Sequence, residues 1–135
     1  MSIAKYPSLR PRKGLVLEAY MSRADIGSGL RRFVVLQVGR KYVHLFYAPR
    51  LMSIRITLAQ WRDLHMQPVT TFSEAKFKAH VRERVAQFER YSGQFNHGNV
   101  ERILGMTLTC GLDWFRDNGW KPGLIALAPS KVRRG

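Results

Sequence analysis

The chain has 135 residues, of which 23 are Lys or Arg and 9 are Asp or Glu, and its formal net charge at pH 7 is +14. Hydrophobic residues make up 45% of the sequence and charged residues 24%. This composition is typical of a folded globular protein and argues against intrinsic disorder. The length favours a single domain with a substantial core.

The positive charge is concentrated in the first half of the chain. Residues 1–62 contain twelve basic and two acidic side chains, a net charge of +10, whereas residues 63–135 contain eleven and seven, a net charge of +4. Such a surplus attracts polyanions and speeds encounter with them. Nucleic acid, either DNA or RNA, is therefore the first partner that the composition predicts, ahead of an acidic protein or an anionic membrane surface.

Three further features indicate a cytoplasmic protein. The single cysteine, Cys110, allows no internal disulfide, which fits a reducing compartment. The N-terminal residues lack the apolar segment of a signal peptide. No apolar run approaches the roughly 20 residues that a membrane-spanning helix needs, so we expect no membrane association.

Residues 1–13 contain Pro7 and Pro11 among basic side chains and predict an extended N-terminal arm, because proline fixes φ and removes a hydrogen-bond donor. Gly14–Met21 follows as a first strand. Residues 22–29 are rich in turn-forming residues and predict a long loop, which could contact a partner.

Residues 30–58 form the part of the sequence around which the fold is predicted to be organised. Apolar runs at Leu30–Val38, Tyr42–Tyr47 and Met52–Leu58 predict three antiparallel strands, joined by a tight turn at Gly39–Lys41 and a break at Pro49.

Alternation of side chains along these strands predicts two faces of a sheet. The residues expected to face the core are Val34, Leu36, Val38, Val43, Leu45, Tyr47, Ile54 and Ile56. Those expected on the opposite face are Arg31, Phe33, Tyr42, His44, Phe46 and Arg55.

The second half of the sequence predicts helices. Thr57–Leu64 reads as one helical turn with Trp61 as a packing residue, and Met66–Thr70 reads as a linker. Thr71–Tyr91 is predicted as a helix that starts at a capping box formed by Thr71 and Glu74. Its apolar stripe, at helical spacing, consists of Phe77, Val81, Val85 and Phe88.

A second helix is predicted from Asn99 to Asp117, with an apolar face broad enough for a central position. Leu124–Leu127 could add a last short strand, and residues 130–135 form a basic tail. Together these elements predict an α+β fold: a small antiparallel sheet or SH3-like barrel of four to five strands, followed by two packed helices. The domain would span residues 14–129, with strands in 14–64 and the helices in 71–118.

The basic side chains on the predicted sheet and first long helix are the candidate nucleic-acid contacts. Arginine and lysine bind phosphates, and an exposed aromatic ring can stack on a base. The same sheet face could instead be a second core layer beneath the helix, and the helix cations could form a solvated face with neighbouring glutamates. The predicted contacts are Arg31, Arg32, Arg40, Lys41, Tyr42, Arg50, Arg55, Lys76, Lys78 and Arg82.

The sequence contains no recognisable motif for a metal, a cofactor or a small-molecule substrate. Its four histidines are scattered, and Cys110 lies in an apolar stretch, so the leading hypothesis is a non-catalytic nucleic-acid-binding protein. One alternative is a small inhibitor or adaptor, of phage or mobile-element type, that binds a protein of a nucleic-acid-processing complex. The other is a metal-independent ribonuclease that uses His44, Tyr47 and Arg50.

Overall fold

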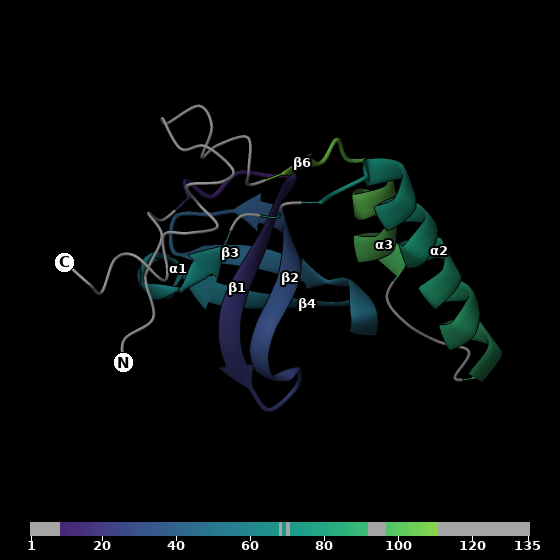
Figure 1. Ribbon diagram of the computed structural model, residues 1–135, viewed down its shortest axis with the longest axis horizontal. Coiled ribbons are helices and arrows are strands. Elements are labelled where there is room, and N and C mark those ends of the chain that lie inside the picture. The colour runs from purple at the N-terminus through teal and green to yellow at the C-terminus, as the bar shows by residue number, and fades with distance from the viewer. Residues whose placement is uncertain (1–8, 68, 70, 92–96, 111–135) are drawn as a thin grey trace.

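The structure, a computed structural model, describes residues 9–67, 69, 71–91 and 97–110. It confirms an α+β fold (Figure 1). The strand-rich part contains β1 (Leu15–Arg23), β2 (Gly27–Val38), β3 (Tyr42–Tyr47), the short 3₁₀ helix η1 (Ala48–Arg50) and β4 (Met52–Thr57). The elements that follow are α1 (Leu58–Asp63), β5 (Met66–Gln67), α2 (Glu74–Tyr91), α3 (His97–Leu104) and β6 (Thr109–Cys110).

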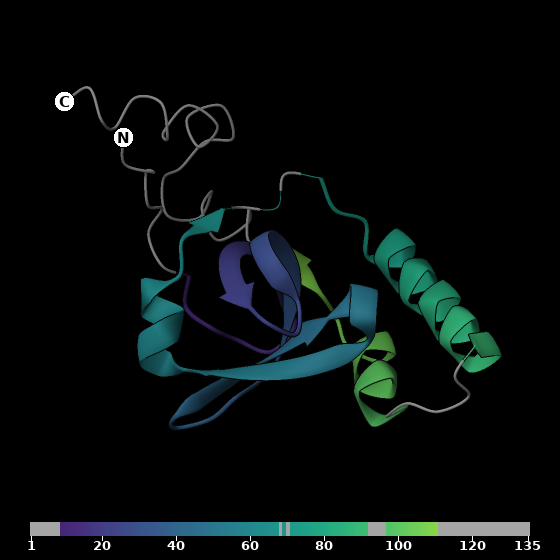
Figure 2. The same cartoon turned by 90° about the horizontal axis from the view of Figure 1, so that it is seen from below.

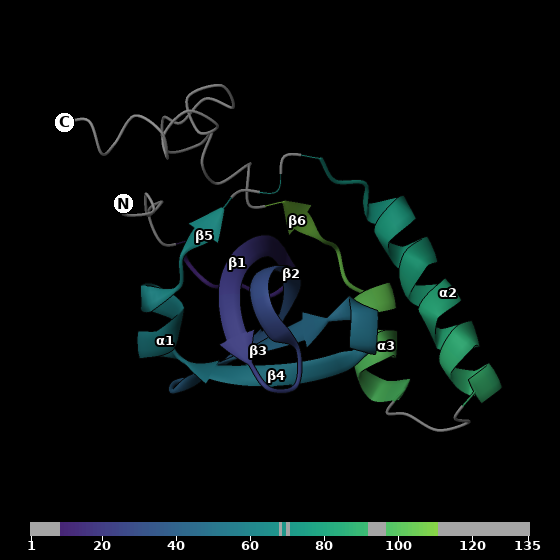
Figure 3. The same cartoon turned by 60° about the horizontal axis from the view of Figure 1, so that its bottom comes forward.

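The described strands form one open, mostly antiparallel sheet. Its strand order is β4-β3-β2-β1-β5, and β6 adds a parallel pairing to β1. Among the described strands no pairing joins the two ends of this order, so the finer prediction of a closed barrel finds no support. The sheet lies between α1 on one side and α2 with α3 on the other, as Figures 2 and 3 show.

The predicted long loop at residues 22–29 is wrong. β1 and β2 continue almost to their tip as a hairpin, with Ser22 paired to Ser28 and Arg23 paired to Gly27. Gly27 and Gly29 have φ values of 80° and 140°, which glycine adopts without steric cost. The turn-forming residues of this segment therefore make a tight hairpin end.

The predicted strand faces are wrong for part of β2, because a β-bulge shifts its register. Val38 pairs with Val43, as the tight turn at residues 39–41 predicts, but Leu36 is an extra residue and Val35 pairs with Leu45. One extra residue reverses the alternation of side chains for the part of the strand that precedes it. The residues that change face relative to the prediction are Arg31, Phe33, Val34 and Leu36. Val38, which is also predicted to face the core, is 39% exposed.

Each face of the sheet has its own core. The first core lies on the α1 side, where Trp61 is 1% exposed and its indole N–H donates to the carbonyl oxygen of Leu9 at 2.7 Å. The predicted helical turn and the packing role of Trp61 are thus confirmed, and Thr57 caps α1 in a capping box with Gln60. The first core comprises Leu9, Leu15, Leu17, Ala19, Met21, Ile26, Phe33, Val35, Val43, Leu45, Tyr47, Ile54, Ile56, Trp61 and Met66.

The second core lies between the sheet and the pair α2 and α3. The predicted stripe of α2 is confirmed, because Val81 is fully buried there and the other three members pack against this core. The second core comprises Val16, Val34, Leu36, Phe46, Ala48, Leu51, Val69, Val81, Val100, Ile103, Met106 and Leu108. This arrangement is the core layer beneath a helix that the sequence left open as an alternative.

Two predicted boundaries in the second half need correction. α2 begins at Glu74, and Ser73 caps it by accepting the Lys76 N–H at 3.3 Å, so the proposed box with Thr71 is wrong. Part of the predicted linker at 66–70 is the strand β5, whose Met66 pairs with Ala19.

The predicted helix 99–117 is also wrong, because α3 ends at Leu104. The chain turns at Gly105, and Thr109 and Cys110 pair with Leu15 and Val16 of β1. The β-branched residues Thr107 and Thr109 favour this extended form. The remaining part of the predicted helix, the strand at 124–127, the tail at 130–135 and the first eight residues of the arm lie outside the described residues.

Candidate nucleic-acid interface

A cleft opens where α2 diverges from the sheet. Its walls are the first half of β2, the η1 turn, and the start of α2 with the segment that precedes it, and its volume is about 680 Å³. None of the described residues that line it is acidic. The lining residues are Leu30, Arg31, Arg32, Tyr47, Ala48, Pro49, Thr71, Phe72, Ser73, Lys76, Phe77 and His80.

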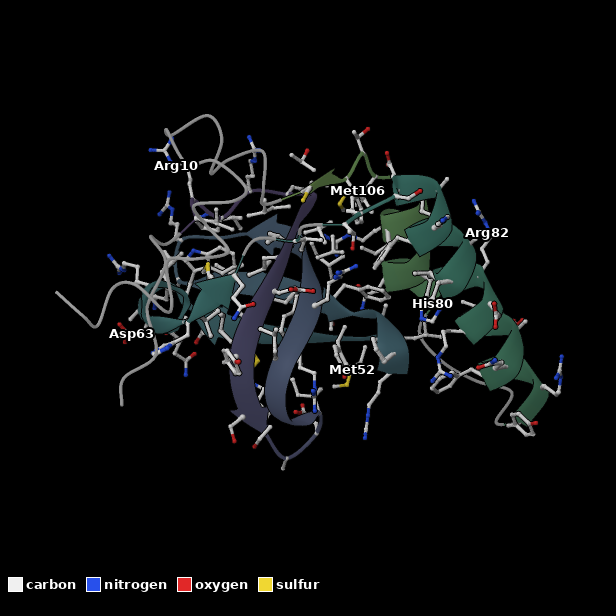
Figure 4. The ribbon with its side chains drawn as sticks, in the orientation of Figure 1. Arg10, Met52, Asp63, His80, Arg82 and Met106 are labelled. Atoms are coloured by element: carbon white, nitrogen blue, oxygen red, sulfur yellow. The ribbon has the colours of Figure 1, made fainter. Side chains whose placement is uncertain are left out.

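The α2 wall presents two polar side chains to the cleft. Lys76 and His80 are four residues apart, so they lie one above the other on the same side of the helix. Both are exposed. Figure 4 shows His80 directed from α2 toward the sheet, whereas Arg82 points away from it. The helix therefore directs Lys76 and His80 into the cleft and Arg82 into solvent.

The sheet wall contributes two arginines, each held by the hairpin. Arg31 donates to the carbonyl oxygens of Ile26, Leu30 and Ser28 at 3.2–3.4 Å, so its guanidinium braces the hairpin end. Arg32 forms a cross-strand ion pair with Glu18 at 2.9 Å. The pair is partly exposed, and the Arg32 guanidinium has five N–H donors, so it can donate to a further acceptor.

Two sets of contacts hold α2 in place beside the cleft. Arg84 donates from Nε to the carbonyl oxygen of Pro49 at 3.1 Å and thereby ties the helix to η1. At the start of the helix, Glu74 pairs with Lys78 at 3.0 Å and accepts the Leu108 N–H at 3.1 Å. The hydrogen bond from Lys78, followed by that from Leu108, lowers the pKa of Glu74 below its usual value. The helix wall is therefore anchored at both ends of the cleft.

A second cationic group lies at the β2–β3 turn. Arg40 and Lys41 are exposed there, and the Arg55 guanidinium sits over the Tyr42 ring, 4.4 Å from its centroid. The rise of an extended strand places this turn roughly 20–25 Å from the two cleft arginines. We call Arg40, Lys41, Tyr42 and Arg55 the turn group.

The structure thus separates the ten predicted contact residues. Three line the cleft, namely Arg31, Arg32 and Lys76, and four form the turn group. Lys78 is engaged internally, because its ammonium also donates to the carbonyl oxygen of Met106 at 2.7 Å. Arg50 and Arg82 are exposed outside the cleft lining.

The predicted aromatic sheet face is wrong for its two phenylalanines. Phe33 is fully buried in the first core, where its ring lies 5.7 Å from that of Tyr47, and Phe46 is fully buried in the second. Of the predicted aromatic contacts, Tyr42 remains partly exposed. The Arg55 guanidinium covers the Tyr42 ring in a cation–π contact, so this face of the ring is already occupied.

The predicted ribonuclease residues do not converge. His44 and Tyr47 are separated by an odd number of positions on β3, so their side chains leave opposite faces of the sheet. Tyr47 belongs to the first core, whereas His44 shares a face with Phe46 of the second. Within the described residues, no three His, Cys, Asp or Glu side chains gather in a way that could hold a metal ion.

Sequence reasoning missed His80 and Phe72 as members of a site. His80 is one helical turn from Lys76, and that spacing was a readable signal. Phe72 precedes the helix, and its ring lies 6.1 Å from that of Phe77, which only the path of the chain into α2 determines.

The chain matches no protein-family model, no curated protein and no solved structure. Within the part of the chain that the structure describes, no helix combines the length and apolar character needed to cross a bilayer. The chemistry of the cleft and of the turn group is therefore the guide to what the protein binds.

Proposed function

We propose that this protein binds nucleic acid without catalysing a reaction on it, and that the cleft is the centre of the binding surface. The observation that carries the proposal is the lining of the cleft, which combines Arg31, Arg32, Lys76 and His80 with no acidic side chain among its described residues. A concave surface with one sign of charge focuses its field on a polyanion.

The charge of the rest of the molecule supports the same partner. The described residues include seventeen Lys and Arg against seven Asp and Glu, a net charge of +10. Arg23, Arg32 and Lys78 form ion pairs, and the seven described carboxylates are too few to neutralise seventeen cations one by one. The turn group offers a second set of phosphate contacts at the other end of β2, and a polynucleotide is long enough to reach both.

A salt titration tests the proposal. Binding of a labelled oligonucleotide is followed by fluorescence anisotropy between about 50 and 200 mM salt, and a protein with six to ten phosphate contacts loses roughly 10³–10⁵-fold in affinity over this range. A salt-independent affinity, or no binding at the lowest salt concentration, would refute nucleic-acid binding.

A pair of charge-matched variants locates the surface. Lys76→Gln removes one cation from the cleft, and we expect weaker binding with a salt slope reduced by about 0.7–0.9. Arg90→Gln removes one exposed cation from the last turn of α2, ten residues or about 15 Å beyond His80. We expect this control to bind like the parent protein. Equal losses in the two variants would contradict the assignment of the cleft.

A further inference from the structure

We infer that the cleft receives one unstacked nucleobase together with its adjoining phosphate, so that the protein prefers single-stranded nucleic acid. This inference rests on the proposed function and adds to it the part of the nucleic acid that enters the cleft. The observation that carries it is the apolar part of the cleft lining, which phosphate contacts alone would not require.

The apolar part of the cleft lining consists of aromatic rings and aliphatic side chains. Phe72 and Phe77 form a tilted ring pair with centroids 6.1 Å apart, and both rings are partly exposed. Leu30 and Ala48 line the opposite wall beside Pro49. A phosphate gains nothing from such a surface, whereas the flat face of a base stacks on aromatic rings irrespective of its sequence.

Basic side chains lie beside these rings in positions that suit the phosphate attached to such a base. Lys76 and His80 border Phe77 on the same helix, and Arg32 lies on the β2 side. A ligand with an apolar face and an anionic group could therefore place its face on the aromatic rings and its anionic group beside the basic side chains. The volume of about 680 Å³ lies within the roughly 300–1,000 Å³ typical of cavities that enclose a small organic group.

Strandedness follows from which surfaces a nucleic acid can present. In a duplex both faces of each base are covered by neighbouring base pairs, so only base edges, sugars and phosphates reach a protein. A single strand can splay a base outward, and sequence-tolerant binders of single strands combine a cationic surface with aromatic stacking. The ring pair beside Arg32, Lys76 and His80 meets that description.

The decisive experiment compares two ligands of equal charge. A short labelled oligothymidine and an abasic oligonucleotide of the same length carry the same phosphates, but only the first has bases. We expect the intact protein to bind the oligothymidine about 5- to 100-fold more tightly, which corresponds to one stacked base. A duplex of the same length covers both faces of its bases, so we expect it to bind more weakly than the oligothymidine although it carries more phosphates.

The outcomes separate this inference from the proposed function. Equal, salt-dependent binding of both strands would overturn the base site while leaving nucleic-acid binding in place, and no binding of either strand would overturn both. Thymidine monophosphate is the third arm, because a free nucleotide has the same chemistry. If it competed as effectively as the whole oligothymidine, the ligand would be a nucleotide, and the preference for a strand would be refuted.

Two substitutions then assign the base and phosphate contacts. Phe72→Ala should bring oligothymidine affinity down to that of the abasic strand and leave the latter unchanged. Lys76→Gln should weaken both to a similar extent. If Phe72→Ala fails to fold, the comparison of ligands with the unmodified protein still decides the question.

Discussion

Gly14 lies where the chain enters β1, and its replacement by alanine should strongly destabilise the fold. Its φ is +88°, in the left-handed region, where a residue with a Cβ is strained by roughly 1–2 kcal/mol. An alanine Cβ would also overlap the backbone carbonyl oxygen of Thr107. Because that contact is with backbone, the strand β6 would have to move away from β1.

The cost of that movement follows from the hydrogen bonds at Gly14. Its carbonyl oxygen accepts the Thr109 N–H at 2.8 Å, and its own N–H donates to the Val35 carbonyl oxygen at 2.8 Å. The loss of one such bond costs about 0.5–1.5 kcal/mol. With the backbone strain included, we expect Gly14→Ala to lower the free energy of unfolding by about 2–4 kcal/mol, a large part of the roughly 5–15 kcal/mol of a typical domain.

Gly39→Ala is the matched control. Gly39 does not have a positive φ, and an added Cβ would meet its nearest atom, the Tyr42 carbonyl oxygen, at an ordinary 3.5 Å. We expect this variant to change stability by at most about 1 kcal/mol in either direction. Urea denaturation followed by circular dichroism measures both variants. If Gly14→Ala unfolded at the same urea concentration as Gly39→Ala, the proposed tight packing of β6 against Gly14 would be refuted.

Two further substitutions test the anchoring of the helices. Trp61→Phe removes the buried indole N–H that donates to the Leu9 carbonyl oxygen and leaves that carbonyl without its donor. We expect urea denaturation to show that the free energy of unfolding falls by about 2–4 kcal/mol. An unchanged midpoint would contradict the role of Trp61. Glu74→Gln tests the carboxylate whose pKa is lowered by the hydrogen bond from Lys78. A carboxylate with a lowered pKa in the folded state stabilises the protein at pH values above its ordinary pKa of 4.5. That stabilisation is lost as the pH falls through the folded-state pKa. The stability difference between the parent protein and Glu74→Gln should therefore be largest at neutral pH and shrink in acid. Parallel curves of stability against pH for the two proteins would rule out this contribution.

The candidate site shows how far reasoning from side-chain type alone can go. The prediction selected arginine and lysine by residue type, but the sequence could not separate a cation that faces a cleft from one that stabilises the fold. Lys78 and Lys76 are two positions apart on α2, yet the first binds Glu74 and Met106 and the second lines the cleft. That difference arises because the segment at residues 106–108 returns to the start of α2, a contact between positions distant in the chain.

Local patterns in the sequence determined the elements themselves: the alternation of β3 and β4, the tight turn before Tyr42, the capped α1 turn and the apolar stripe of α2 all depend on neighbours within a few residues. Tertiary structure alone decided the rest. The extra residue Leu36 reversed the faces of β2, and the pairing of Thr109 with Gly14 and β1 ended the predicted helix early. Both outcomes follow from contacts between segments that are distant in the sequence. The free energy of such contacts exceeds the local preference of the residues, and no short stretch of sequence contains both partners.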